Sequence, residues 1–123
     1  GPGRLFLMAA SAGALRWTVL AFSTALPVLF VVQTLHAFTF GAAHLAAMAF
    51  ISRAIPAHLS ATAQSLHGSV ALSVAAGVTA PFLGYLYEAF GSGAFHAMTL
   101  FSIAGGACAF LLMRRWDGCK IAL

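Results

Sequence analysis

Four long apolar stretches fill most of the chain, and charged residues almost never interrupt them. The stretches cover residues 5–22, 27–51, 61–87 and 94–113. A helix rises about 1.5 Å per residue, so about 20 apolar residues cross the roughly 30 Å core of a bilayer. Only 7% of the residues are charged, whereas soluble domains carry about 25%. The pattern predicts an all-α membrane protein with four transmembrane helices in a single transmembrane region.

The basic residues predict the orientation of these helices. Five of the six share one set of span ends: Arg4, Arg53, Arg114, Arg115 and Lys120. The turns at 23–26 and 88–93 contain no Lys or Arg. Because short basic loops stay in the cytoplasm, we expect both termini and the 52–60 loop on the cytoplasmic side of the inner membrane. The net charge of +4 forms no continuous patch, so nucleic acid is not an expected partner.

A polar and aromatic stripe follows one side of the second stretch. At about 100° per residue, Gln33, Phe40 and His44 lie within about 40° of one another, and His36 lies at the edge. Polar groups inside a membrane cost free energy to insert and therefore mark candidate functional positions. The stripe suits a helix that faces a water-filled cavity or a solute. The alternative is that the histidines only hydrogen-bond neighbouring helices.

Two further polar residues open the third stretch. Gln64 and His67 lie about 60° apart around the helix and therefore share one side. His44 lies roughly 16 Å before the cytoplasmic end of its own helix, so we expect His44 and His67 at similar depth. A headgroup-level hydrogen bond is an equal alternative for Gln64. A haem held between the two histidines is another alternative, and would make the chain a redox anchor.

Arg16 and Trp17 lie in the outer half of the first stretch. Asp and Glu are absent from all four stretches, so Arg16 has no carboxylate there to pair with. The favoured interpretation is an interface anchor, in which Arg16 extends outward to water and Trp17 joins the aromatic belt. The alternative is an arginine that locks helices together or binds an anion.

Small residues predict where helices approach closely, because helix association in lipid depends on backbone contact. The third stretch carries a ridge of such residues: Ser69, Ser73, Gly77, Ala80 and Gly84. We expect this ridge to be a contact face, and a bundle of more than four helices would use it best. Cys108 and Cys119 are expected to be free thiols. We expect no catalytic residue, metal or cofactor.

Two segments resemble parts of the major facilitator superfamily. The first reads Arg53-Ala-Ile-Pro56-Ala-His-Leu-Ser-Ala-Thr62-Ala63-Gln64 and leads into a helix that ends Gly84-Tyr85-Leu86-Tyr87-Glu88. It resembles the connection from the tenth to the eleventh helix and the eleventh helix itself. The second contains His44-Leu45-Ala46-Ala47-Met48. It resembles the branch that includes phenylpropionic acid permeases and nucleoside:proton symporters.

The resemblance implies that residues 1–123 are helices nine to twelve of a twelve-helix transporter, which is not an enzyme. The implied partners are the lipid bilayer, the remaining helices, a proton and a small organic solute such as an aromatic acid or a nucleoside. In such a transporter the tenth helix lines the central cavity. Gln33, His36, Phe40 and His44 would then face the solute and proton pathway, and Gln64 and His67 would flank it.

Two other classes of membrane protein have a similar size. A small four-helix multidrug exporter needs a carboxylate embedded in the membrane, but the only acidic residues are Glu88 and Asp117, at or beyond span ends. A purely structural membrane subunit is the second alternative.

Overall fold

The structure, a computed structural model, describes residues 1–121 and is almost entirely helical. No strand occurs within that range. Among the described residues, three helical segments are long and apolar enough to cross a membrane: Pro2–Phe22, Leu26–Ala54 and Ala57–Arg115. An apolar solvent offers the backbone no hydrogen-bond partners, so helices that satisfy their own backbone groups are the expected form. The predicted fold class, an all-α membrane protein, is confirmed.

The first two helices each begin at or beside a proline, and α2 also ends close to one. α1 runs Pro2–Phe22 and α2 runs Leu26–Ala54, and each has a proline in its first turn. Proline costs nothing there, because the first backbone N–H groups of a helix have no partner within it. α2 ends at Ala54 and the next residue, Ile55, has extended dihedrals (φ −100°, ψ 137°), because Pro56 disfavours the helical region in the residue before it.

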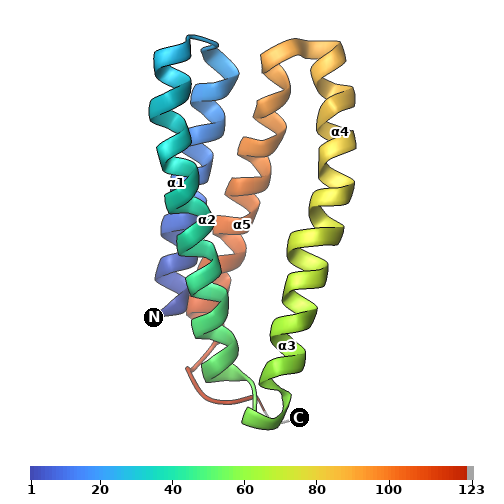
Figure 1. The fold of residues 1–123 in the computed structure, drawn as a ribbon. Coiled ribbons are helices and arrows are strands. Elements are labelled where there is room, and N and C mark those ends of the chain that lie inside the picture. The colour runs from blue at the N-terminus through green and yellow to red at the C-terminus, as the bar shows by residue number, and fades with distance from the viewer. Residues whose placement is uncertain (122–123) are drawn as a thin grey trace.

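The third apolar segment folds back on itself. Its elements are η1 (Ala57–Leu59), α3 (Ser60–His67), the π-helical η2 (Gly68–Val74), α4 (Ala75–Phe90), η3 (Gly91–Ala94) and α5 (Phe95–Arg115). The chain reverses at Gly91, whose φ of 60° suits a residue without a side chain. The 59-residue segment therefore has two antiparallel arms, α3–α4 and α5 (Figure 1). Four membrane crossings stay a prediction.

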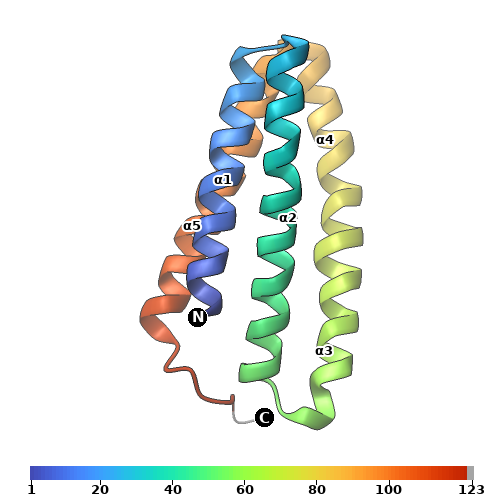
Figure 2. The ribbon, with the colours of Figure 1, turned by 60° about the vertical axis from the view of Figure 1, so that its left-hand side comes forward.

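α1 is the central helix of the packed part of the molecule. It lies against both α2 and α5, whereas α3 and α4 form an arm with few contacts to the rest (Figures 1 and 2). A Cβ added to Gly13 of α1 would lie 3.1 Å from Ser102 Oγ of α5. The hydroxyls of Thr18 and Thr99 lie 3.3 Å apart across the same contact. Small and hydroxyl-bearing residues thus bring α1 and α5 together, as expected in lipid.

The small-residue ridge on the α3–α4 arm is exposed along its whole length. A Cβ added to Gly77 or Gly84 would meet no atom within 4 Å. Within residues 1–121, the close helix contacts of small residues therefore lie between α1 and α5 and not on this ridge. Its role as a contact face stays a prediction for a larger bundle.

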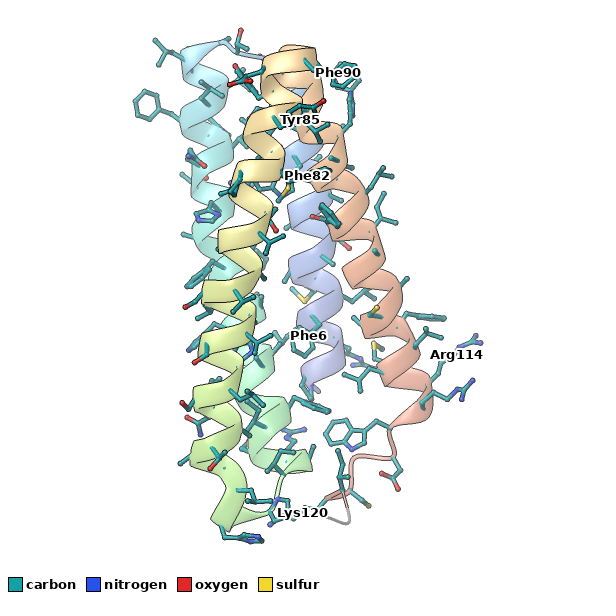
Figure 3. All side chains as sticks on the ribbon, turned by 90° about the vertical axis from the view of Figure 1, so that its right-hand side faces the viewer. Phe6, Phe82, Tyr85, Phe90, Arg114 and Lys120 are labelled. Atoms are coloured by element: carbon teal, nitrogen blue, oxygen red, sulfur yellow. The ribbon has the colours of Figure 1, made fainter. Side chains whose placement is uncertain are left out.

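The N-terminus, the C-terminal tail as far as Ile121 and the α2–α3 connection lie at one end of the molecule (Figures 1 and 2). Figure 3 shows Arg114 and Lys120 toward this end and Phe90 at the opposite one. The backbone N–H of Ile121 donates to the Ala54 carbonyl over 2.7 Å, which ties the C-terminal tail to α2. The basic ends of the predicted spans therefore share one end of the fold.

Cysteine labelling in intact cells tests which side of the membrane this end of the molecule faces. Cys108 and Cys119 are free thiols and would first be replaced by serine. We expect Thr24→Cys, in an exposed turn, to react with an impermeant maleimide added to intact cells. Ala57→Cys should react only after permeabilisation, because basic loops stay inside. The reverse pattern would contradict the predicted orientation.

Candidate functional site

Three aromatic rings follow one face of α2. His36, Phe40 and His44 occupy successive turns because residues four apart are neighbours on a helix surface. The ring centroids of His36 and Phe40 lie 6.3 Å apart, and those of Phe40 and His44 are also 6.3 Å apart. The Phe40 and His44 rings are nearly parallel, at 6°. Most of the predicted stripe is thus a continuous row of rings.

His67 of α3 extends this row onto a second helix. Its ring centroid lies 6.4 Å from that of His44. The two histidines line a pocket of about 180 Å³ together with Phe40 and with Phe6 of α1, which Figure 3 labels beside the α3–α4 arm. The structure thus brings together the two histidines that were expected at similar depth.

Gln64 does not join the row of rings. Its Nε2 donates to Ser60 Oγ over 3.3 Å, one turn earlier in the same exposed helix. Gln33, at the other end of the stripe, is engaged by Arg16 of α1. The predicted stripe therefore has two parts. The rings of His36, Phe40 and His44 form a row that leads to His67, and the amide of Gln33 accepts a hydrogen bond from Arg16.

The position of Arg16 corrects the favoured sequence interpretation. Its side chain does not extend outward to water but is only 6% exposed. Nη1 donates to Gln33 Oε1 over 3.3 Å, and Cζ lies 3.9 Å from the ring centroid of Trp17. The Trp17 ring stacks in turn on Phe95, with centroids 5.6 Å apart. Because α1 lies between α2 and α5, Arg16 is enclosed and links two helices.

One sequence signal pointed to this link. Arg16 lies seven residues before the Ser23 C-cap of α1, and Gln33 lies seven residues after Leu26, the first residue of α2. Two residues equally far from a tight turn between antiparallel helices lie at similar depth, since each residue rises about 1.5 Å. Sequence reasoning treated the two residues separately and missed the pair.

A larger pocket of about 340 Å³ lies between α1, α2 and α5. Arg16 and Trp17 line it from α1, His36 and Phe40 from α2, and Ser102 from α5. Phe6 and Phe40 also line the smaller pocket that contains His44 and His67. The candidate site therefore consists of two adjoining pockets, one with a buried cation and one with a histidine pair. No group of three or more metal-ligating side chains occurs in the part of the chain that the structure describes.

Comparisons with known proteins agree with this architecture. The family model described as "MFS_1 like family" matches residues 1–98. A protein of Escherichia coli (strain K12) named as a probable 3-phenylpropionic acid transporter is 35% identical over 99 residues. That alignment covers 80% of this chain and 26% of the relative, so the chain spans about a quarter of the relative's length. No solved structure matches the chain.

The long apolar helices define a multi-pass, all-α membrane protein. The chain belongs to the MFS_1 like family, and its resemblance to the major facilitator superfamily is thereby confirmed. This is a family of transporters and not of enzymes. The small multidrug exporter and the haem anchor, which the sequence left as alternatives, belong to other classes of membrane protein than this family.

Proposed function

We propose that this chain forms helices nine to twelve of a twelve-helix, proton-coupled transporter of a small aromatic carboxylate. The observation that carries the proposal is the ring row His36–Phe40–His44, which meets His67, in a chain 35% identical to a probable 3-phenylpropionic acid transporter. The relative is about four times as long as the aligned segment, which supports a place within a longer bundle. The bundle belongs in the inner membrane with both chain ends in the cytoplasm.

The exposed face of α2 lines the central cavity in this proposal. Phe40 is 53% exposed, and His36 and His44 beside it are also exposed. Polar side chains within a membrane face water-filled cavities rather than lipid, because insertion into lipid costs free energy. Phe40 would stack on the aromatic ring of the solute, and the His44–His67 pair would carry the coupling proton.

The other elements support this face. α1 and α5 pack behind α2 through their small residues, and α3 presents His67 to α2. Gln64 flanks the cavity entrance from α3. Transporters of this kind bind their solute between two halves of the bundle, which rock against each other to open alternately on each side. The solute would therefore lie between the exposed face of α2 and the other half of the protein.

Uptake into vesicles tests the proposal. Vesicles that contain the full-length transporter should accumulate radiolabelled 3-phenylpropionate when the outside is made acidic. One proton per solute and about one pH unit supply about 1.4 kcal/mol, which supports about tenfold accumulation. A protonophore should abolish the accumulation, and excess uridine should not compete. Accumulation that persists with the protonophore would contradict proton coupling, and competition by uridine would favour a nucleoside as solute.

A further inference from the structure

The helix that begins with α3 changes its hydrogen-bond pattern directly after His67. α3 ends at His67, the π-helical η2 covers Gly68–Val74, and α4 resumes the α-helical pattern at Ala75. The backbone N–H of Ala75 accordingly donates to the carbonyl of Val70, five residues earlier. π-helical turns are rare, and they occur frequently at functional sites. η2 is therefore a candidate functional element of this helix.

η2 adjoins the pocket that contains the histidine pair. Ala71 and Leu72 of η2 line this pocket of about 180 Å³ together with His44 and His67. His67 directly precedes η2 in the chain, and its ring centroid lies 6.4 Å from that of His44. The irregular turn thus forms one wall of the pocket and carries one member of the pair at its end. A change in η2 therefore changes the pocket.

A π-helical and an α-helical form of η2 differ in register. In the α-helical form the N–H of Ala75 donates to Ala71, four residues earlier, instead of to Val70. Both forms satisfy the backbone within the helix, so neither leaves polar groups unpaired in lipid. A π-helical turn holds about one residue more than an α-helical turn, and one residue of an α-helix turns by about 100°. Conversion of η2 therefore rotates α3 about its own axis relative to α4.

The elements on either side allow α3 to turn while α4 stays in place. The far end of α4 is held against α5, where the Tyr87 and Phe95 rings meet edge to face with centroids 5.8 Å apart. α3 follows a connection that is not α-helical, made of the extended Ile55, Pro56 and the 3₁₀ turn η1. A few residues at the ends of an element are enough to absorb a rotation. The eight residues of α3 can therefore turn as one unit.

We propose that η2 is a register switch that carries His67 into and out of contact with His44. In the π-helical form the two rings lie beside each other, as observed. In the α-helical form α3 is turned by about 100°, and His67 leaves the pocket. This inference rests on the proposed function and deepens it, because it names the element that makes and breaks the histidine pair during transport.

Deletion of Ser69 from the full-length transporter tests the switch. Ser69 is an exposed residue of η2 that does not line the histidine pocket. With one residue fewer, the segment closes as an α-helix while α3 and α4 keep the orientation of the π-helical form. Because His67 is then held beside His44, proton-driven uptake of 3-phenylpropionate should fall at least about tenfold, since alternating access requires movement. The melting temperature should not fall.

Ser69→Ala is the matched control for the deletion. It removes the same hydroxyl but keeps the length of η2, so the switch is retained. Uptake by this variant should equal that of the wild-type protein.

Hydrogen exchange, measured by mass spectrometry on the detergent-solubilised transporter, gives a readout that does not depend on uptake. An amide must leave its hydrogen bond to exchange, so residues 68–75 should exchange at least about tenfold faster in the wild type than in the deletion variant. Added 3-phenylpropionate should change the wild-type rate at least about threefold and leave the deletion variant unchanged. The amides of α1 should exchange equally in both proteins.

Three results would overturn the inference. Normal uptake by a folded deletion variant would show that η2 is a fixed irregularity. Equal exchange of residues 68–75 in the wild type and the deletion variant would show that the segment does not switch. Should the deletion variant fail to fold, a wild-type exchange rate that 3-phenylpropionate leaves unchanged would also overturn it. Absence of uptake by the wild-type protein would instead defeat the proposed function, and the exchange rates of the two proteins would still decide on the switch.

Discussion

His44→Ala is expected to abolish proton-driven uptake by the full-length transporter while leaving its expression unchanged. His44 stacks on Phe40 and faces His67, with centroids 6.3 and 6.4 Å away. It is thus the one ring that belongs both to the α2 row and to the histidine pair. An alanine cannot take up a proton, so accumulation under about one pH unit should fall from about tenfold to none.

Uptake of radiolabelled solute at several pH values measures this effect, with His58→Ala as the matched control. His58 is an exposed histidine of η1, away from the ring row, so its removal should leave uptake unchanged. His67→Ala should reduce proton coupling as well, because it removes the partner ring of the pair. Normal uptake by His44→Ala from about pH 5 to 8 would show that the histidines only pack helices together.

Gly13→Leu is expected to prevent correct assembly of the helices. A Cβ at this position would already lie 3.1 Å from Ser102 Oγ and 3.6 Å from Ser102 Cβ. The remaining leucine atoms would force α1 and α5 apart and disturb the position of Arg16 one turn later. Overpacking of this kind costs about 1–3 kcal/mol, which a lower melting temperature in detergent would report.

Leu100→Ala is the control for this experiment. Leu100 of α5 is 67% exposed, so its truncation should change the melting temperature very little. Gly77→Leu tests the ridge on α4, which has open space around it in this segment. A melting temperature as low as that of Gly13→Leu would show that other helices of the full-length protein cover the ridge. Equal melting temperatures for Gly13→Leu and Leu100→Ala would contradict the close α1–α5 contact.

The row of rings on α2 could be predicted from the sequence because it depends on helical geometry alone. Residues 36, 40 and 44 are spaced four apart, and any helix places such residues on one face. The meeting of His44 with His67 needed one further assumption, that both helices begin or end at the same membrane surface. The same reasoning could not exclude a purely packing role for these rings, since periodicity says nothing about what a face contacts.

The environment of Arg16 is where sequence reasoning was wrong, and the reason is physical. In a soluble protein, polar and apolar faces of a helix mark its outside and inside. In a membrane, lipid tails are as apolar as a protein core, so both faces of α1 carry the same kinds of side chain. Nothing in the pattern therefore marked α1 as the central helix. Because no acidic residue lies in the four stretches to pair with Arg16, the sequence favoured a position at the interface.

The sequence by itself determined the solvent, the fold class and which residues share one face of a helix. Long apolar stretches require a bilayer, and a bilayer requires helices whose backbone groups bond within each segment. Only the tertiary structure decided which helices are neighbours: α1 between α2 and α5, Gly13 against Ser102, and Arg16 against Gln33. Those contacts depend on shape and on single polar bonds between segments, and neither leaves a periodic trace along the chain.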